Sequence, residues 1–285
     1  MTMMDTTILR GATASASRTC PRIVAVASGK GGVGKTWFSV SLAQCLALRS
    51  RPLRVLVLDG DFGLANVDIQ LGLLPQCDLK DVVAGRSSLE DSIVRVPVGD
   101  ALPGGRAVSF DVLPGHSGMP SLSALGAGQI EDLVASVREL YEYDVILFDL
   151  CAGIDVTTRR MAARADTTLV LTTEEPTALT DAYAVIKLLT RDRTSLGFES
   201  GDVRLVINQT SSYRSGQRIY DSLARACGAF LGQAPALAGM IRRDGRVSDS
   251  IRHQALMALR HPNAPSLQDV QRVAEGLLQT MPAVG

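Results

Sequence analysis

An eight-residue stretch near the N-terminus has the residue types and spacing of a phosphate-binding loop. It consists of Gly29, Lys30, Gly31, Gly32, Val33, Gly34, Lys35 and Thr36, which fit the pattern GxxxxGK[ST]. Glycines allow successive backbone N–H groups to face one point, and a helix that follows adds partial positive charge there. The spacing predicts a site for a nucleoside triphosphate with Mg²⁺, in which Lys35 contacts the β- and γ-phosphates and the Thr36 hydroxyl binds the metal.

Carboxylates follow two apolar runs that are typical of buried strands. Asp59 and Asp61 come after the run at residues 54–58, and Asp149 comes after the run at residues 145–148 in a Walker B-like arrangement. Opposite a triphosphate a carboxylate serves the metal or the attacking water, because repulsion forbids direct contact with phosphate. We expect Asp149 to accept a hydrogen bond from a water on Mg²⁺. Capping of a turn or helix is the alternative role for Asp61.

The elements that must position these residues alternate between strand and helix. This rhythm predicts an α/β fold with a doubly wound, mostly parallel sheet, whose ligands bind at the carboxyl ends of the strands. The predicted strands are Ile23–Ala27, Arg54–Leu58, Val145–Phe148, Thr168–Leu171, Val203–Ile207 and Leu237–Ile241, with another ending at Asp111–Leu113. The predicted helices are Thr36–Leu48, Ile130–Tyr141, Thr177–Leu189, Arg214–Leu231 and Ser266–Gln279. We expect residues 1–20 to form a flexible tail, residues 21–285 to form a single domain that includes the C-terminal helix 266–280, and surface loops at 104–105 and 195–201.

Composition narrows the class of protein. Hydrophobic residues make up 46% of the chain but aromatic residues only 4%, so Val, Leu, Ile and Ala must fill the core. The 29 basic and 29 acidic residues balance, so we expect no strong binding to nucleic acid. The five cysteines lack metal-binding spacing, which excludes an iron–sulfur role and favours a reducing compartment. Without a run of about 20 apolar residues, the sequence predicts a cytoplasmic protein that does not span a membrane.

Lys30 is the residue that separates this loop from an ordinary phosphate loop. The stretch KGGVGKT resembles the deviant Walker A motif of the MinD/ParA superfamily. The resemblance implies a MinD-like (SIMIBI class) P-loop fold, slow ATP hydrolysis, and a homodimer that forms when ATP binds. It also implies that Lys30 crosses the dimer interface to the nucleotide of the partner subunit. A solvated loop lysine is the alternative interpretation.

Further motifs extend the resemblance. Residues 59–68 resemble the first switch of the superfamily, DxDxGxxNxD, which implies that Asp61 positions the attacking water and that Asp59 supports Mg²⁺ and the lysine network. After Asp149, the superfamily usually has a hydroxyl residue and then Pro or Gly, whereas this chain has Leu150 and Cys151 before Ala152 and Gly153. Gly153 is expected to give flexibility near the γ-phosphate.

Asn208 follows a predicted strand. Its amide offers one donor and one acceptor, which suit the edge of adenine, and the resemblance implies this role. An Asn at the end of a strand is also a common turn former.

Residues 173–189 resemble the flagellar-number regulators of the FlhG/FleN branch. Residues 239–244 agree with this branch, although Arg242 stands where the superfamily usually has Pro. The resemblance implies control of the number and placement of polar flagella. Its expected partners are a flagellar GTPase resembling FlhF and a flagellar transcription activator resembling FleQ. A MinD-type ATPase that selects the division site and a ParA-type DNA-partitioning ATPase remain alternatives.

Two late features bear on those alternatives. An apolar stripe in the last predicted helix is interpreted as a packing face, with peripheral contact to the inner face of the cytoplasmic membrane as the alternative. It consists of Leu267, Val270, Val273, Leu277 and Leu278. Arg242, Arg243, Arg246 and Arg252 are interpreted as a solvated basic edge, with nonspecific DNA binding as the alternative.

Overall fold

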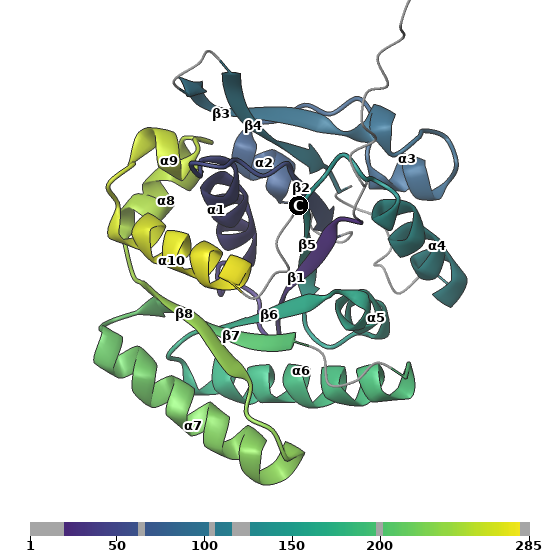
Figure 1. Ribbon diagram of the computed structural model, residues 1–285. Coiled ribbons are helices and arrows are strands. Elements are labelled where there is room, and N and C mark those ends of the chain that lie inside the picture. Colours follow the sequence, from purple (N-terminus) through teal and green to yellow (C-terminus); the bar gives the residue numbers. More distant parts are fainter. Residues whose placement is uncertain (1–19, 62–65, 103–105, 116–125, 198–201, 280–285) are drawn as a thin grey trace, which may run out of the picture.

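A single mixed sheet forms the centre of the molecule (Figure 1). The structure is a computed structural model and describes residues 20–61, 66–102, 106–115, 126–197 and 202–279. Within these residues, eight strands pair in the order β3-β4-β2-β5-β1-β6-β7-β8. The strands are β1 (Arg22–Ser28), β2 (Val55–Gly60), β3 (Val94–Leu102), β4 (Arg106–Leu113), β5 (Val145–Ala152), β6 (Thr167–Thr172), β7 (Asp202–Thr210) and β8 (Ala236–Arg242).

The strand that carries the phosphate loop and the two strands that carry acidic residues are neighbours. β5 pairs in parallel with β1 on one side and with β2 on the other, and Asp59 lies opposite Asp149 in the register. All the other pairings are parallel too, except that β3 runs antiparallel to β4 at the edge of the sheet. The sheet is therefore mostly parallel, as the sequence predicts, and it gathers the acidic strand ends beside the phosphate loop.

Helices cover both faces of the sheet (Figure 1). Val24 and Val26 belong to a core that includes α1 and α10, whereas Ile23 and Ala25 belong to a core that includes α4 and α5. A third core joins α6 and α7 to the sheet. The helices are α1 (Lys35–Ala47), α2 (Val67–Leu71), α3 (Leu79–Val83), the 3-10 helix η1 (Glu90–Ser92), α4 (Ala127–Arg138), α5 (Val156–Arg164), α6 (Pro176–Ser195), α7 (Tyr213–Leu231), α8 (Gly245–Arg252), α9 (Met257–Arg260) and α10 (Pro265–Gln279).

Local sequence explains where the helices near the site begin. Gly34 precedes α1 with a φ of 93°, in the left-handed region that a β-carbon disfavours. Pro176 opens α6 at a position where a missing backbone N–H costs nothing. The Asp155 side chain caps α5 and the Ser212 side chain caps α7 through backbone N–H groups.

The C-terminal helix packs against the sheet. Leu267, Val270, Val273 and Leu277 of α10 are at most 2% exposed and belong to the same core as α1, and Leu278 packs against that core while partly buried. The prediction of a packing face is therefore confirmed. Among the described residues, no helix is long and apolar enough to cross a membrane.

Every strand and helix named from the sequence is present, within a few residues at its ends. Strand β3 and helix α5 are additional, as are the short helices α2, α3, α8 and α9. The expected loop at 195–201 begins later, because Ser195 still belongs to α6. The predicted flexible tail at 1–20, apart from Cys20, and the predicted loop at 104–105 lie outside the described residues.

Candidate nucleotide site

The loop between β1 and α1 is shaped by the absence of side chains. A β-carbon on Gly29 would lie 2.4 Å from the backbone oxygen of Asp181, and one on Gly34 would lie 2.6 Å from Nδ2 of Asn208. Gly32 also has a positive φ, of 77°. At Gly31, by contrast, an added β-carbon would meet nothing within 4 Å. Tight packing thus explains the glycines at 29 and 34, and backbone conformation explains the glycine at 32.

Lys35 lies among the acidic strand ends. Its Nζ donates a hydrogen bond to Oγ of Ser28 at 3.0 Å. Burial lowers the pKa of Lys35, and the negative charges of Asp149 and Asp61 act in the opposite direction. The ammonium group is therefore held in a largely desolvated place where an anionic ligand would gain a strong, charge-assisted contact.

Asp149 is fully enclosed beside α1. Its Oδ1 accepts a hydrogen bond from Oγ of Ser39 at 3.0 Å. Burial raises the pKa of Asp149, while a hydrogen bond from the Thr36 hydroxyl and the charge of Lys35 oppose that shift. Thr36 and Asp149, the two predicted metal-site residues of α1 and β5, therefore contact each other.

Asp59 organises the loop after β2. Its two carboxylate oxygens accept backbone N–H groups of Asp61, Asn66 and Val67, each at 3.0 Å. Burial and the nearby Asp149 raise the pKa of Asp59, although these hydrogen bonds counteract the shift. Asp59 therefore fixes the start of the first switch as well as adding negative charge next to Asp149.

These residues fit Mg²⁺ bound together with a nucleotide. The nearby groups are carboxylates and hydroxyls, which are the oxygen donors that Mg²⁺ prefers. No cluster of three or more His, Cys, Asp or Glu side chains able to hold a metal occurs in the described part of the chain.

Asp61 lies beside the segment that follows Asp149. The Sγ of Cys151 lies 3.2 Å from Oδ1 of Asp61 and 3.5 Å from the backbone oxygen of Gly60. Gly153 follows with a φ of 110°, and its N–H donates to the backbone oxygen of Ser28 at 2.9 Å. The sequence identified Asp61 and Gly153. Cys151 packs against the core while partly buried, and its thiol also contacts the Asp61 carboxylate.

Lys30 contacts α6 of its own chain. Its Nζ lies 2.5 Å from Oε2 of Glu175 and 3.0 Å from Oγ1 of Thr177. Both partners of the ion pair are substantially solvent-exposed. The lysine therefore lies at the surface of the site, and the interactions that it makes within one chain are weak enough to exchange.

The far end of the loop contacts β7. Asn208 is buried, and its Nδ2 donates to the backbone oxygen of Val33 at 2.7 Å. Gln209 has a φ of 56°, which is unusual for a residue with a side chain, and its Nε2 reaches the backbone oxygen of Gly32 at 3.4 Å. Asn208 thus supports the loop in addition to its predicted role at the base.

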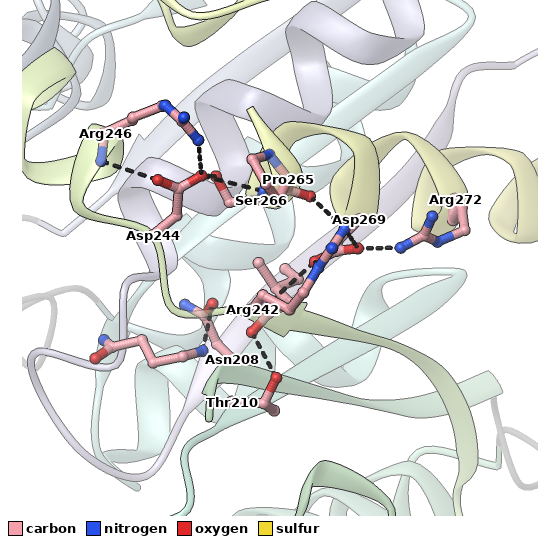
Figure 2. A network of polar contacts seen from close by, with 11 residues as sticks. Asn208, Thr210, Arg242, Asp244, Arg246, Pro265, Ser266, Asp269 and Arg272 are labelled. Carbon is pink, nitrogen blue, oxygen red and sulfur yellow. Dashed lines mark hydrogen bonds and ion pairs between the residues drawn. The ribbon is translucent and has the colours of Figure 1, made fainter. Parts of the chain in front are cut away.

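A polar network ties β8 to α10 next to Asn208 (Figure 2). Arg242 donates to the buried Asp269 through its backbone N, its Nε and its Nη2, and Arg272 makes a further contact with Asp269. Arg246 pairs with Asp244, which also accepts from Ser266. All four late arginines are exposed, as the prediction of a solvated basic edge requires, and two of them, Arg242 and Arg246, also form ion pairs.

The structure brings most of the predicted site residues together around the phosphate loop. It adds Ser28, Ser39, Glu175 and Gln209, whose contacts depend on strand register and helix packing. Spacing within the sequence gives no signal for them, apart from Ser28, which directly precedes the loop.

Comparison with known proteins identifies the family. The model of the CobQ/CobB/MinD/ParA nucleotide binding domain matches residues 24–256. The antiactivator FleN of Pseudomonas aeruginosa is 34% identical over 255 residues, which cover 89% of this chain and 85% of that protein. The flagellum site-determining protein YlxH of Helicobacter pylori is 28% identical over 259 residues, which cover 90% and 81%.

Solved structures agree with this fold. The cell division ATPase MinD of Pyrococcus furiosus superposes with a TM-score of 0.71 at 22% identity, covering 91% of this chain and 99% of that one. MinD of Pyrococcus horikoshii, complexed with Mg-ADP, superposes with a TM-score of 0.70 at 22% identity, covering 90% and 96%. By its sequence, its sheet and its phosphate loop, the chain belongs to the MinD/ParA family of P-loop nucleotide-binding proteins and resembles the flagellar members of that family.

Proposed function

We propose that this protein is a slow, regulatory ATPase that dimerises when it binds Mg-ATP and controls the number and placement of polar flagella. The observation that carries the flagellar part is the similarity to FleN and YlxH over nine-tenths of the chain. The switch part is supported by Lys30, Lys35 and the acidic strand ends, which lie around one loop.

In this proposal the phosphate loop holds the nucleotide through its backbone N–H groups and Lys35. Thr36 and Asp149 hold Mg²⁺, with Asp59 supporting the metal and the loop that carries Asp61. Bound Mg-ATP supplies a γ-phosphoryl group that water can attack. Asp61 orients that water, and Asn208 contacts the edge of the base.

Dimer formation in this proposal requires Lys30 to exchange partners. Within one chain its ammonium group is paired with Glu175 and Thr177. In the dimer it would instead contact the nucleotide of the partner subunit, where a triphosphate offers more negative charge than one carboxylate. The loss of the γ-phosphate would then favour return to Glu175, which links hydrolysis to dissociation.

The proposed location is the cytoplasm; peripheral contact with the inner face of the membrane, the alternative, gains no support from α10, whose apolar stripe packs in the core. The proposed partners are a flagellar GTPase resembling FlhF and a flagellar transcription activator resembling FleQ. Nonspecific DNA binding gains no support, since Arg242 and Arg246 are already paired with Asp269 and Asp244.

Deleting the gene in its host and counting polar flagella by electron microscopy tests the proposal. We expect more flagella per pole, restored to the normal number by the wild-type gene but not by the Lys30→Ala or Lys35→Ala variant. Lys187→Ala is the matched control, because Lys187 lies exposed on α6. A normal number of flagella in the deletion strain would contradict the flagellar role.

A division-site role is the second candidate, because the septum site-determining protein MinD of Synechocystis is 33% identical over 190 residues, which cover 66% of this chain. Cell length in the same deletion strain separates the two roles. Minicells with normal flagella would favour the division-site role.

A further inference from the structure

The segment after Asp149, which by resemblance to the superfamily forms the second switch, contains a thiol next to the carboxylate of Asp61. Strand register explains the arrangement, because β2 and β5 run in parallel with Asp59 opposite Asp149 and Gly60 opposite Leu150. One residue further along both strands, Asp61 and Cys151 lie side by side, with Sγ and Oδ1 3.2 Å apart. A residue at position 151 is therefore well placed to influence the orientation of Asp61.

The end of β5 that carries this thiol is firmly held. Leu150 is 1% exposed and packs in the core beneath α4 and α5. A β-carbon on Gly60 would lie 3.1 Å from Cδ2 of Leu150 and 3.2 Å from the backbone oxygen of Asp149, so the two strands approach closely here. The thiol of Cys151 consequently projects from a fixed backbone.

Two acceptors lie within reach of the single proton on Sγ. The Asp61 carboxylate is nearer than the backbone oxygen of Gly60, and a carboxylate is a stronger acceptor than a carbonyl. The backbone N–H of Asp61 is also fixed, by Oδ1 of Asp59 at 3.0 Å. Asp61 is therefore restrained at its main chain by the first switch and at its side chain by the second.

The same region contains Lys35, the cation of the phosphate site. Asp61 and Cys151 both contribute to the electrostatic environment of Lys35, so the thiol, the carboxylate and the ammonium group share one small region. The thiol–carboxylate contact therefore lies close to the ammonium group that would contact the γ-phosphate in the proposed ATPase.

We propose that Cys151 is a positioning residue for ATP hydrolysis. Its S–H group donates to Oδ1 of Asp61 and so holds that carboxylate in the orientation in which it positions the attacking water. Cys151 acts through Asp61, so its removal slows hydrolysis without weakening nucleotide binding. This inference rests on the proposed ATPase activity.

The test compares single-turnover ATP hydrolysis and ATP affinity in matched variants. We expect Cys151→Ala to slow hydrolysis about 3- to 10-fold, because small losses of orientation are costly in phosphoryl transfer. ATP affinity should stay within about twofold of wild type, because an interaction that acts only in the transition state does not contribute to binding. Cys151→Ser, which keeps a donor, should retain at least about half of the wild-type rate.

A double-mutant cycle tests whether Cys151 acts through Asp61. Adding Cys151→Ala to Asp61→Ala should slow hydrolysis no further, since the group that the thiol positions is already gone. Cys77→Ala is the control, because Cys77 is a half-buried free cysteine outside the site and should hydrolyse ATP at the wild-type rate. Cys151→Val provides a second donor-free variant of larger volume if Cys151→Ala does not fold.

The outcomes separate this inference from the proposed function. Hydrolysis at the wild-type rate by Cys151→Ala or Cys151→Val would overturn the positioning role and leave the ATPase proposal intact. If Cys151→Ala slowed hydrolysis equally in the wild-type protein and in the Asp61→Ala variant, that result would also overturn the positioning role. A wild-type protein that binds ATP but never hydrolyses it would overturn both.

Discussion

The proposed phosphate end and the proposed base end of the site are built in different ways. At the phosphate end, eight consecutive residues supply the loop, and tight contacts at Gly29 and Gly34 fix its path. At the base end, Asn208 of β7, Arg242 of β8 and Asp269 of α10 come from three separate elements (Figure 2). The difference teaches that the first end depends on local backbone shape, whereas the second depends on how distant elements pack.

The phosphate end should show the largest effect on binding. We expect Lys35→Ala to weaken ATP binding at least about 100-fold, because it removes a desolvated cation that makes charge-assisted contacts with phosphate. Quenching or enhancement of Trp37 fluorescence can follow the titration, since Trp37 is the only tryptophan and adjoins Thr36. Lys187→Ala is the control. An ATP affinity of Lys35→Ala within a few-fold of wild type would contradict the claim that the phosphate end dominates nucleotide binding.

The network at the base end should affect stability more than binding. Asp269→Ala removes the buried acceptor of several hydrogen bonds from Arg242 and Arg272, but leaves those exposed arginines hydrated, so we expect a loss of about 1–2 kcal/mol in the free energy of unfolding. Urea denaturation measures the loss, and Glu275→Gln, an exposed change on the same helix, is the control. In the absence of urea, the folded Asp269→Ala variant should bind ATP with an affinity within about threefold of wild type. An unchanged midpoint of unfolding would show that the network does not hold α10.

Asn208 connects the two ends. We expect Asn208→Ala to weaken ATP binding about tenfold, the effect of losing one hydrogen bond of about 1.4 kcal/mol, and to reduce the preference for ATP over GTP. Calorimetry with both nucleotides measures the two effects, with the exposed Asn263→Ala variant as the control. An equal loss for ATP and GTP would assign Asn208 to support of the loop, through its bond to Val33, rather than to the base.

The acidic strand ends predict a smaller dependence on pH. Burial raises the pKa values of Asp59 and Asp149 above those of exposed carboxyls. Mg²⁺ requires the charged forms of these carboxylates, so protonation competes with metal binding. The affinity for Mg-ATP should therefore be highest at high pH and should decline as the pH falls. Protonation of Asp149, whose pKa is raised to about 6, should by itself give a loss of about fourfold between about pH 8 and pH 5.5. Parallel titrations without Mg²⁺ correct for protonation of the nucleotide. A Mg²⁺-dependent affinity for ATP that rises as the pH falls would contradict the predicted direction of the pH dependence.

The sequence predicted the parts of the fold that have strong local signals. Strands β1, β2 and β5 contain continuous apolar runs, which is the pattern of a parallel sheet buried on both faces. Strand β3 was missed because Pro97 and Gly99 interrupt it, and these residues are tolerated because β3 lies at the edge of the sheet. Helix α5 was missed because its sequence, VTTRRMAAR, combines a polar composition with β-branched residues.

The candidate site likewise contains some residues with strong local sequence signals and others without them. The loop, Asp59, Asp61 and Asp149 could be found from spacing and from their places after apolar runs. The contact between Cys151 and Asp61 depends on the register of β2 and β5, and the pairing of Arg242 with Asp269 depends on the docking of α10 onto β8. Such contacts join residues 27 to 90 positions apart, so no local pattern predicts them.

Sedimentation velocity with Mg-ATP or Mg-ADP tests the central claim most directly, with Asp61→Ala used to slow hydrolysis and Lys30→Ala to remove the lysine expected to act across the interface. Wild type and Asp61→Ala should sediment as dimers with Mg-ATP and as monomers with Mg-ADP, while Lys30→Ala remains a monomer with either nucleotide. Monomers throughout, in protein that binds ATP, would contradict the dimer switch, as would a dimer of Lys30→Ala equal to wild type.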